Sequence, residues 1–262
     1  MTDSRGLRDK QVSRTTAQGG SDGARGGGNP VGAVGVQGFV SVTNFVQSAA
    51  GVFFAGSITG FGVAIAMRVL SVPAGTTIAY TSGDSSARGG AAYYVAANGF
   101  AFAVYSTAGV QIISPYSVIG AGDVEKVLLF CLLHDSANLR TYRAGAEVGA
   151  GTPIVGYKPP AGVDRTALGS GVAGVIGIPW ARMLGAVCFT GIPTPADILA
   201  HYNACKAANT MESMGGAGVV NVNRWQAKDN IPNAATWVDD IGGMVLTKTG
   251  TLQSVIFNPT WE

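Results

Sequence analysis

The chain has 262 residues, of which 47% are hydrophobic and 12% are charged, and its formal net charge is +2. A length in this range fits one large β-domain or a medium domain with appendages. Five basic residues and three acidic ones lie within residues 1–30, so the rest of the chain carries equal numbers of each sign. This near-neutral body excludes the clustered basic face of a nucleic-acid-binding domain. Low charge together with 39 glycines is typical of an all-β protein or of a subunit that its neighbours largely cover.

Residues 1–38 are predicted to form a glycine-rich N-terminal arm, because they lack hydrophobic periodicity and end in "GGSDGARGGGNPVGAVGVQG". Ordering a residue costs about 1–2 kcal/mol, and this composition offers little apolar burial to offset it. We therefore expect neighbouring subunits to hold the arm. The basic residues proposed as assembly contacts are Arg5, Arg8, Lys10 and Arg14.

The N-terminal stretch "MTDSRGLRDKQVSRTT" is polar where a signal peptide would need an apolar core. Glycines break every apolar run well short of the roughly 20 residues that span a bilayer, so no membrane span is predicted. We expect synthesis in the cytoplasm and a final location in a virion or an extracellular assembly.

Residues 39–210 are predicted to form one β-sandwich domain. Short segments rich in Val, Ile, Tyr and Phe alternate with Gly, Asn, Asp or Pro, which indicates an antiparallel sandwich or barrel. The segment "YYVAANGFAFAVY" is a hairpin in which Asn98–Gly99 supplies a type I′ turn. Its alternation places Phe100, Phe102 and Val104 on one face.

One helix is predicted in "GIPTPADILAHYNACKAAN". Thr194 can cap it, Pro195 suits the first helical position, and Asp197 stands three residues after the cap. The positions at helical spacing that should form its apolar face are Ile198, Leu199, Tyr202 and Cys205.

Residues 211–262, which contain the glycine-rich break "SMGGAG" near their start, are predicted to form an extended C-terminal segment. Its three tryptophans are too many apolar rings for a disordered tail, so they should pack on the sandwich or on another subunit. As candidate assembly contacts they are Trp225, Trp237 and Trp261.

Three motifs follow one another in a recognisable order. The first has the form hhh-D-xxxx-hYxxG, the second is an "LGS" strand, and the third is a closing strand that runs into G-x-P-T and a helix. Their residues here are Asp135, Tyr142 and Gly145; Leu168, Gly169 and Ser170; and Gly191, Pro193, Thr194, Ile198 and Tyr202. Over a little more than half its length, the chain thus resembles the concanavalin A-like, laminin-G-type jelly roll. The resemblance implies two antiparallel sheets packed face to face, one of them concave, with end loops that bind glycans or calcium in many relatives.

The jelly-roll resemblance leaves the function open, because the fold hosts lectins, glycanases, adhesion modules and virion proteins. The glycanase members use a strand with carboxylates at alternate positions. None of the four glutamates, Glu125, Glu147, Glu212 and Glu262, lies in such a strand, and no cluster of Asp and Asn suited to calcium is evident. No catalytic residue, cofactor or metal ligand is therefore predicted.

Four other polar or reactive groups have structural interpretations. "HDSAN", residues 134–138, is a hairpin turn, because three consecutive residues diverge too much to form a serine triad. Adjacent Asp239 and Asp240 point to opposite sides of an extended chain and favour a turn. His201 is expected to be half exposed on the helix. Three cysteines without metal-ligand spacing, Cys131, Cys188 and Cys205, are predicted to be buried free thiols.

Two functions remain open from the sequence. The leading hypothesis is a non-enzymatic structural subunit, such as a phage decoration or fibre protein or an extracellular filament, whose partners are copies of itself or other subunits. The alternative is a lectin-like adhesion module that binds a surface glycan. The rings proposed for sugar stacking are Tyr93, Tyr94, Tyr105 and Trp180.

Overall fold

The fold is taken from a computed structural model of the chain. The structure describes residues 33–37, 45–49, 60–83, 90–95, 98–159, 165–169, 177–227, 236–250 and 252–262. The candidate arm contacts Arg5, Arg8, Lys10 and Arg14 lie outside these residues.

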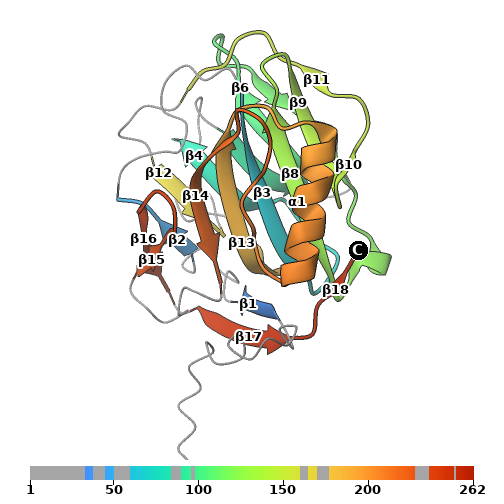
Figure 1. Cartoon of the computed structure of the whole chain (residues 1–262), viewed down its shortest axis with the longest axis vertical. Helices are drawn as coiled ribbons and strands as arrows, with labels where there is room; N and C mark the ends of the chain where they lie inside the picture. Colours follow the sequence, from blue (N-terminus) through green and yellow to red (C-terminus); the bar gives the residue numbers. More distant parts are fainter. Residues whose placement is uncertain are drawn as a thin grey trace, which may run out of the picture.

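Two antiparallel sheets make up most of the described chain (Figure 1). In the ten-stranded sheet, seven strands follow one another and three more attach to β9, β13 and β8. The seven are, in order, β10 (Ala146–Glu147), β9 (Asn138–Arg143), β8 (Lys126–His134), β3 (Phe61–Val69), β13 (Ala181–Thr190), β1 (Ala33–Gln37) and β17 (Gln253–Phe257). The attached strands are β11 (Thr152–Pro153), β14 (Val220–Gln226) and β18 (Thr260–Trp261), of which only β18 pairs in parallel.

The eight-stranded sheet lies against the first across a shared apolar core. Its strands are, in order, β15 (Thr236–Val238), β16 (Val245–Thr249), β2 (Phe45–Gln47), β12 (Arg165–Leu168), β4 (Thr77–Gly83), β5 (Gly90–Val95), β6 (Gly99–Tyr105) and β7 (Gln111–Ile113). The predicted all-β sandwich, a jelly roll of antiparallel sheets with one helix, is therefore confirmed.

The central strands of the ten-stranded sheet are apolar on both faces. In β8, "KVLLFCLLH", Leu128, Phe130 and Leu132 belong to the core between the sheets. The alternate residues Leu129 and Cys131 belong to a second apolar cluster on the other side of the sheet. A strand that is buried on both faces reads as a continuous apolar run, which explains why this segment shows no polar alternation.

The helix α1 (Pro195–Ala208) covers that second face, so the protein has a third layer (Figure 1). The predicted cap is confirmed: the Thr194 hydroxyl accepts from the Asp197 backbone N–H, and the Asp197 carboxylate accepts from the Thr194 N–H at 2.9 Å. The apolar face is largely as predicted, except that Leu199 is 48% exposed. Gly145, with φ +82°, passes so close to α1 that a Cβ would lie 2.7 Å from the Leu199 side chain.

The hairpin of β5 and β6 is confirmed, but its turn differs from the prediction. Val95 pairs with Gly99, so Asn98–Gly99 is not the two-residue connection between the strands. Gly99 instead lies in β6 with φ +126°, where a Cβ would meet the Ser117 carbonyl oxygen at 2.4 Å. The glycine is thus needed for close approach to a neighbouring segment. The predicted face is confirmed, since Phe100, Phe102 and Val104 are fully buried.

Strands from the N-terminal and C-terminal parts of the chain are members of the two sheets. β1, which lies within the predicted arm, pairs with β13 and β17. Trp225 and Trp237 belong to the core between the sheets, and Trp261 packs in the cluster beneath α1. The three tryptophans therefore pack on the sandwich of their own chain, and their role in assembly stays a prediction. Among the described residues, no helix is both long and apolar enough to cross a bilayer.

Candidate functional site

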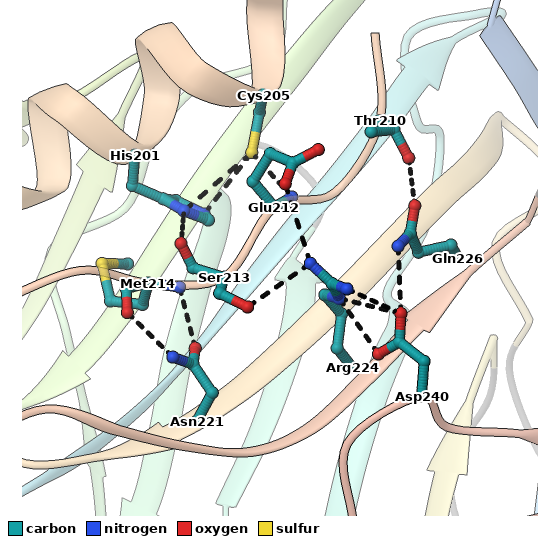
Figure 2. Close-up of polar contacts among 10 residues, drawn as sticks. All are labelled: His201, Cys205, Thr210, Glu212, Ser213, Met214, Asn221, Arg224, Gln226 and Asp240. Carbon is teal, nitrogen blue, oxygen red and sulfur yellow. Dashed lines mark hydrogen bonds and ion pairs between the residues drawn. The ribbon is translucent and has the colours of Figure 1, made fainter. Parts of the chain in front are cut away.

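A polar network lies on the outer face of the ten-stranded sheet, beside the C-terminal half of α1. We call it the Arg224 network, and its members are Thr210, Glu212, Ser213, Arg224, Gln226 and Asp240 (Figure 2). The segment 210–219, which we call the return loop, joins α1 to β14 and supplies three of these residues.

The return loop is held in place by its apolar side chains and by one asparagine. α1 ends at Asn209, whose left-handed backbone (φ 54°, ψ 34°) turns the chain back toward the sheet. Met211 and Met214 then enter the cluster under the helix, at 0% and 2% exposure. The Asn221 side chain bonds both the N–H and the carbonyl of Met214, at 2.8 and 2.9 Å. Glu212 and Ser213 are left on the outside, facing Arg224 (Figure 2).

Arg224 occupies the centre of the network. Its Nε lies 3.0 Å from both carboxylate oxygens of Asp240, and a terminal nitrogen lies 2.8 Å from Oδ2. The guanidinium also donates to Ser213 Oγ at 3.3 Å and lies 3.7 Å from Glu212 Oε2. One guanidinium thus orients two carboxylates and a hydroxyl, with planar geometry that favours this multidentate pairing.

Gln226 extends the network along β14. Residues 224 and 226 share one face of the strand, because side chains alternate. Gln226 donates to Asp240 Oδ2 at 3.1 Å and accepts from the Thr210 hydroxyl. Partial burial would raise the pKa of Asp240, but the hydrogen bonds from Arg224 and Gln226 and the positive charge of Arg224 outweigh burial and lower it.

An open depression of about 630 Å³ adjoins the network. Its lining combines three alanine methyl groups of the helix with the two outward residues of the return loop: Ala204, Ala207, Ala208, Glu212 and Ser213. The depression therefore offers a small apolar surface next to a carboxylate and a hydroxyl that Arg224 holds in fixed positions.

Beneath the return loop lie His201 and Cys205, one helical turn apart. His201 Nδ1 lies 3.2 Å from the Ser213 carbonyl oxygen, and Cys205 Sγ lies 3.7 Å from Nε2. The Glu212 backbone N–H donates to Cys205 Sγ at 3.3 Å. The prediction of a half-exposed His201 is wrong, because the return loop covers it and only 3% remains exposed.

This histidine and cysteine do not form a nucleophilic pair. Burial raises the pKa of Cys205 to about 12 and lowers that of His201 to about 4. A catalytic cysteine needs the opposite, a thiolate that is stabilised and accessible. The prediction that all three cysteines are buried free thiols is confirmed.

The other predicted polar features are turns, as expected. After β8, Asp135 Oδ1 accepts from the backbone N–H groups of Ala137 and Asn138 at 3.0 and 2.6 Å, and β9 returns beside β8. Asp239 is buried and accepts from the N–H of Ile241 at 2.9 Å and from the side chain of Asn223 at 2.7 Å. In the described ranges, no three His, Cys, Asp or Glu side chains converge closely enough to hold a metal ion.

Trp180 and Tyr105, two of the four rings proposed for sugar stacking, do not line the depression. Trp180 is 3% exposed and its Nε1 donates to Thr77 Oγ1 at 2.7 Å, a position that suits a core residue. Tyr105 is partly exposed at the end of β6. Tyr93 and Tyr94 are paired in β5 with Ala101 and Phe100, and their side chains lie outside the described part of the structure. A glycan-binding role for these four residues stays a prediction.

Most of the Arg224 network was not predicted from the sequence. Asp240 was predicted to lie in a turn, and Glu212 was considered only as a glutamate outside a carboxylate-bearing strand. The polar alternation in "VNVNRWQ" could have indicated that Arg224 and Gln226 share the exposed face of a strand. Nothing local indicated that Glu212 and Ser213 would meet them, because that contact depends on the path of the return loop.

A scan against protein-family models and a search of curated proteins each found no match. Among solved structures, the chain is similar to a protein from Bacteroides ovatus to which carbohydrate binding is ascribed. The TM-score is 0.54 and the identity is 10%, and the match covers 87% of this chain and 60% of that one. The chain thus spans 60% of the length of that protein, and the likeness shows the fold alone.

Two further similarities are more partial. The binding domain of botulinum neurotoxin DC, in complex with rat synaptotagmin II, matches at 12% identity and a TM-score of 0.42, over 56% of this chain and 36% of that one. Domain 4 of a GH43 extracellular arabinanase from Geobacillus stearothermophilus, in complex with arabinotriose, matches at 16% identity and a TM-score of 0.42, over 55% of this chain and 67% of that one. Overlaps of this size carry no argument about this chain.

Proposed function

We propose that the chain is a non-enzymatic carbohydrate-binding module and that the depression beside α1 holds the sugar. The observation that carries the proposal is the fixed placement of Glu212 and Ser213 by Arg224 at the rim of the depression. Sugar hydroxyls both donate and accept, so they pair well with a neighbouring carboxylate and hydroxyl. Groups that are already oriented lose little entropy when a ligand binds.

The alanines of α1 supply the apolar contact at the depression, which neither Trp180 nor Tyr105 lines. The C–H groups of a sugar ring can lie on the methyl groups of Ala204, Ala207 and Ala208 while its hydroxyls reach Glu212 and Ser213. Methyl groups give less contact area than an aromatic ring, so we expect modest affinity. The carbohydrate binding ascribed to the structurally similar Bacteroides ovatus protein is a further motive for testing sugars first.

Binding without turnover fits the electrostatics of the network. Glycoside hydrolysis needs one carboxyl group that stays protonated, with a raised pKa, to act as the general acid. Asp240 has a lowered pKa and shares the Arg224 guanidinium with Glu212. The network is therefore suited to accept hydrogen bonds from a ligand rather than to donate a proton to it.

The test is a glycan array followed by calorimetric titration of the best ligand. Glu212→Gln should weaken binding about tenfold or more, because a hydrogen bond to a charged group contributes roughly 1.5–3 kcal/mol. Glu147→Gln is the matched control, since Glu147 pairs with Arg140 at a distance from the depression, and its affinity should equal that of the wild type. The proposal fails if the array shows no ligand, or if Glu212→Gln binds as well as the wild type.

The structural-subunit hypothesis stays a prediction, and so does a location in a virion or filament. It depends on the arm, most of which lies outside the described residues. Because β1 belongs to the sheet, a deletion that tests the arm should stop at residue 32. Negative-stain microscopy should then show particles or fibres only for the full chain. Dispersed monomers of the full chain would count against this hypothesis.

A further inference from the structure

The two residues at the rim of the depression are tied through their backbones to buried His201 and Cys205. The Ser213 carbonyl faces His201 Nδ1 at 3.2 Å, and the Glu212 N–H donates to Cys205 Sγ at 3.3 Å (Figure 2). The side chains of the same two residues point the other way, toward Arg224. Any movement of the return loop away from His201 therefore displaces the rim of the depression.

The hydrogen bond to Ser213 fixes the tautomer of the neutral His201 ring. A carbonyl oxygen can only accept, so Nδ1 carries the proton and Nε2 is the unprotonated nitrogen. Nε2 faces the Cys205 thiol at 3.7 Å, and this thiol can donate to it. In this closed arrangement the ring is neutral and both of its nitrogens have partners.

A second proton on His201 would have no carboxylate hydrogen-bonded to the ring in the described part of the chain. The titratable groups on α1 are Asp197, Tyr202, Cys205 and Lys206; Glu212 lies on the return loop and Arg224 on β14. The Asp197 carboxylate, one helical turn before His201, bonds to Thr194, and Tyr202 and Lys206 bond to the Glu262 carbonyl. Cys205 remains a thiol because burial raises its pKa to about 12, and the Glu212 carboxylate is turned toward Arg224. Within the described residues, no carboxylate oxygen bonds to the imidazole. A buried unpaired cation is costly, so protonation favours exposure of the ring to water.

We infer that His201 is a pH-sensitive switch beneath the binding depression. Its protonation opens the return loop and displaces Glu212 and Ser213, which releases the ligand at acidic pH. The ligand release rests on the proposed function, whereas the loop opening does not. Opening also breaks the bonds of Met214 to Asn221 and exposes Met211, so it is rare at neutral pH.

The expected effect of pH on loop opening follows from the pKa of His201 in the closed and in the open loop. Closed, the pKa of His201 is about 4, and exposed, it returns to the ordinary value of 6.5. The closed loop therefore binds fewer protons than the open one between these pH values and loses stability as the pH falls. By linkage, the opening constant at pH 5 should be about 30-fold larger than at pH 7.5.

Hydrogen exchange of residues 209–219, corrected for intrinsic rates, measures this opening directly. In the wild type, we expect the protection factor to fall about 30-fold from pH 7.5 to pH 5. His201→Gln keeps a side chain that can donate to the Ser213 carbonyl but cannot titrate, so its protection should not depend on pH. His134→Gln, the matched control at the other histidine, should behave as the wild type. A change below threefold in the wild type, or the full change in His201→Gln, overturns the inference.

A second measurement covers the case in which His201→Gln does not fold. The His134→Gln protein has a single histidine, so NMR titration reports His201 alone. A titration midpoint of His201 near pH 4 supports the pH-sensitive switch, and a midpoint near pH 6.5 overturns it. Glycan titration at pH 7.5 tests the proposed function separately: if protection falls as expected but no glycan binds at either pH, the binding function fails and the loop opening stands.

Discussion

Similar types of side chain surround the turn between β8 and β9 and the return loop after α1. In each, a buried histidine lies on the core side and an arginine on the outer side contacts two carboxylates. Arg140 contacts Asp135 and Glu147 at 2.5 Å, as Arg224 contacts Asp240 and Glu212. The two regions differ in what the chain places around these groups.

In the β8–β9 turn the contacts are local. Ser136 N–H donates to His134 Nδ1 at 3.2 Å, so His134 carries its proton on Nε2, the opposite of His201. The His134 ring stacks on Phe61 with centroids 5.0 Å apart, and Asp135 caps the turn. The groups stabilise a hairpin. In the return loop the partners come from three separate segments, and Glu212 and Ser213 remain beside a depression. The same kinds of side chain thus stabilise a hairpin in one place and line an open depression in the other.

The largest expected effect on stability comes from a core residue of β14, the strand that carries Arg224. Trp225 is fully buried next to Arg224, so Trp225→Ala should lower the free energy of unfolding by about 3–5 kcal/mol. Val220 on the same strand is 60% exposed, and Val220→Ala should change it by less than about 0.5 kcal/mol. Urea denaturation measures both. A loss below 1 kcal/mol for Trp225→Ala would mean that β14 is not part of the cooperative core.

The stability of the protein at acidic pH should depend more strongly on His201 than on His134. The pKa of His201 is lowered from 6.5 to about 4 by burial, so its contribution is fully present above pH 6.5 and is lost as the pH falls toward 4. The loss should amount to about 3 kcal/mol, at 1.36 kcal/mol per pKa unit. Burial also lowers the pKa of His134, so this histidine acts in the same direction.

Denaturation at pH 7 and pH 4.5 checks this difference. His201→Gln should lose much less stability over that interval than the wild type, because its side chain cannot be protonated. His134→Gln should keep the larger share of the wild-type loss. If both variants reduced the loss of stability between pH 7 and pH 4.5 by the same amount, the return loop would be no more sensitive to acid than the β8–β9 turn.

The comparison also shows what sequence analysis could reach. The capped helix and the "HDSAN" turn were predictable because the contacts that define them lie within a few residues. The strands were predictable from their local hydrophobic pattern, although some of the strands with which they pair are far away in the sequence. His201 was misplaced because its exposure depends on the return loop, which packs through Met211 and Met214 under α1. The Arg224 network was missed for the same reason, since Arg224 meets Ser213 and Asp240 at separations of 11 and 16 residues. Periodicity reports which face of an element is buried, but not which other segment covers it.

Replacing the arginine of each region should change stability least, but it should distinguish the two regions most clearly by their effect on glycan binding. Arg140 and Arg224 are both partly exposed, at 28% and 20% of their side chains, so replacing either by Gln should cost only about 1 kcal/mol. If the return loop is the ligand site, Arg224→Gln should also weaken glycan binding about tenfold, because Glu212 and Ser213 lose the group that orients them. Arg140→Gln should leave binding unchanged. A similar loss of affinity in both variants would reflect general destabilisation, and binding would then have to be assigned elsewhere on the sandwich.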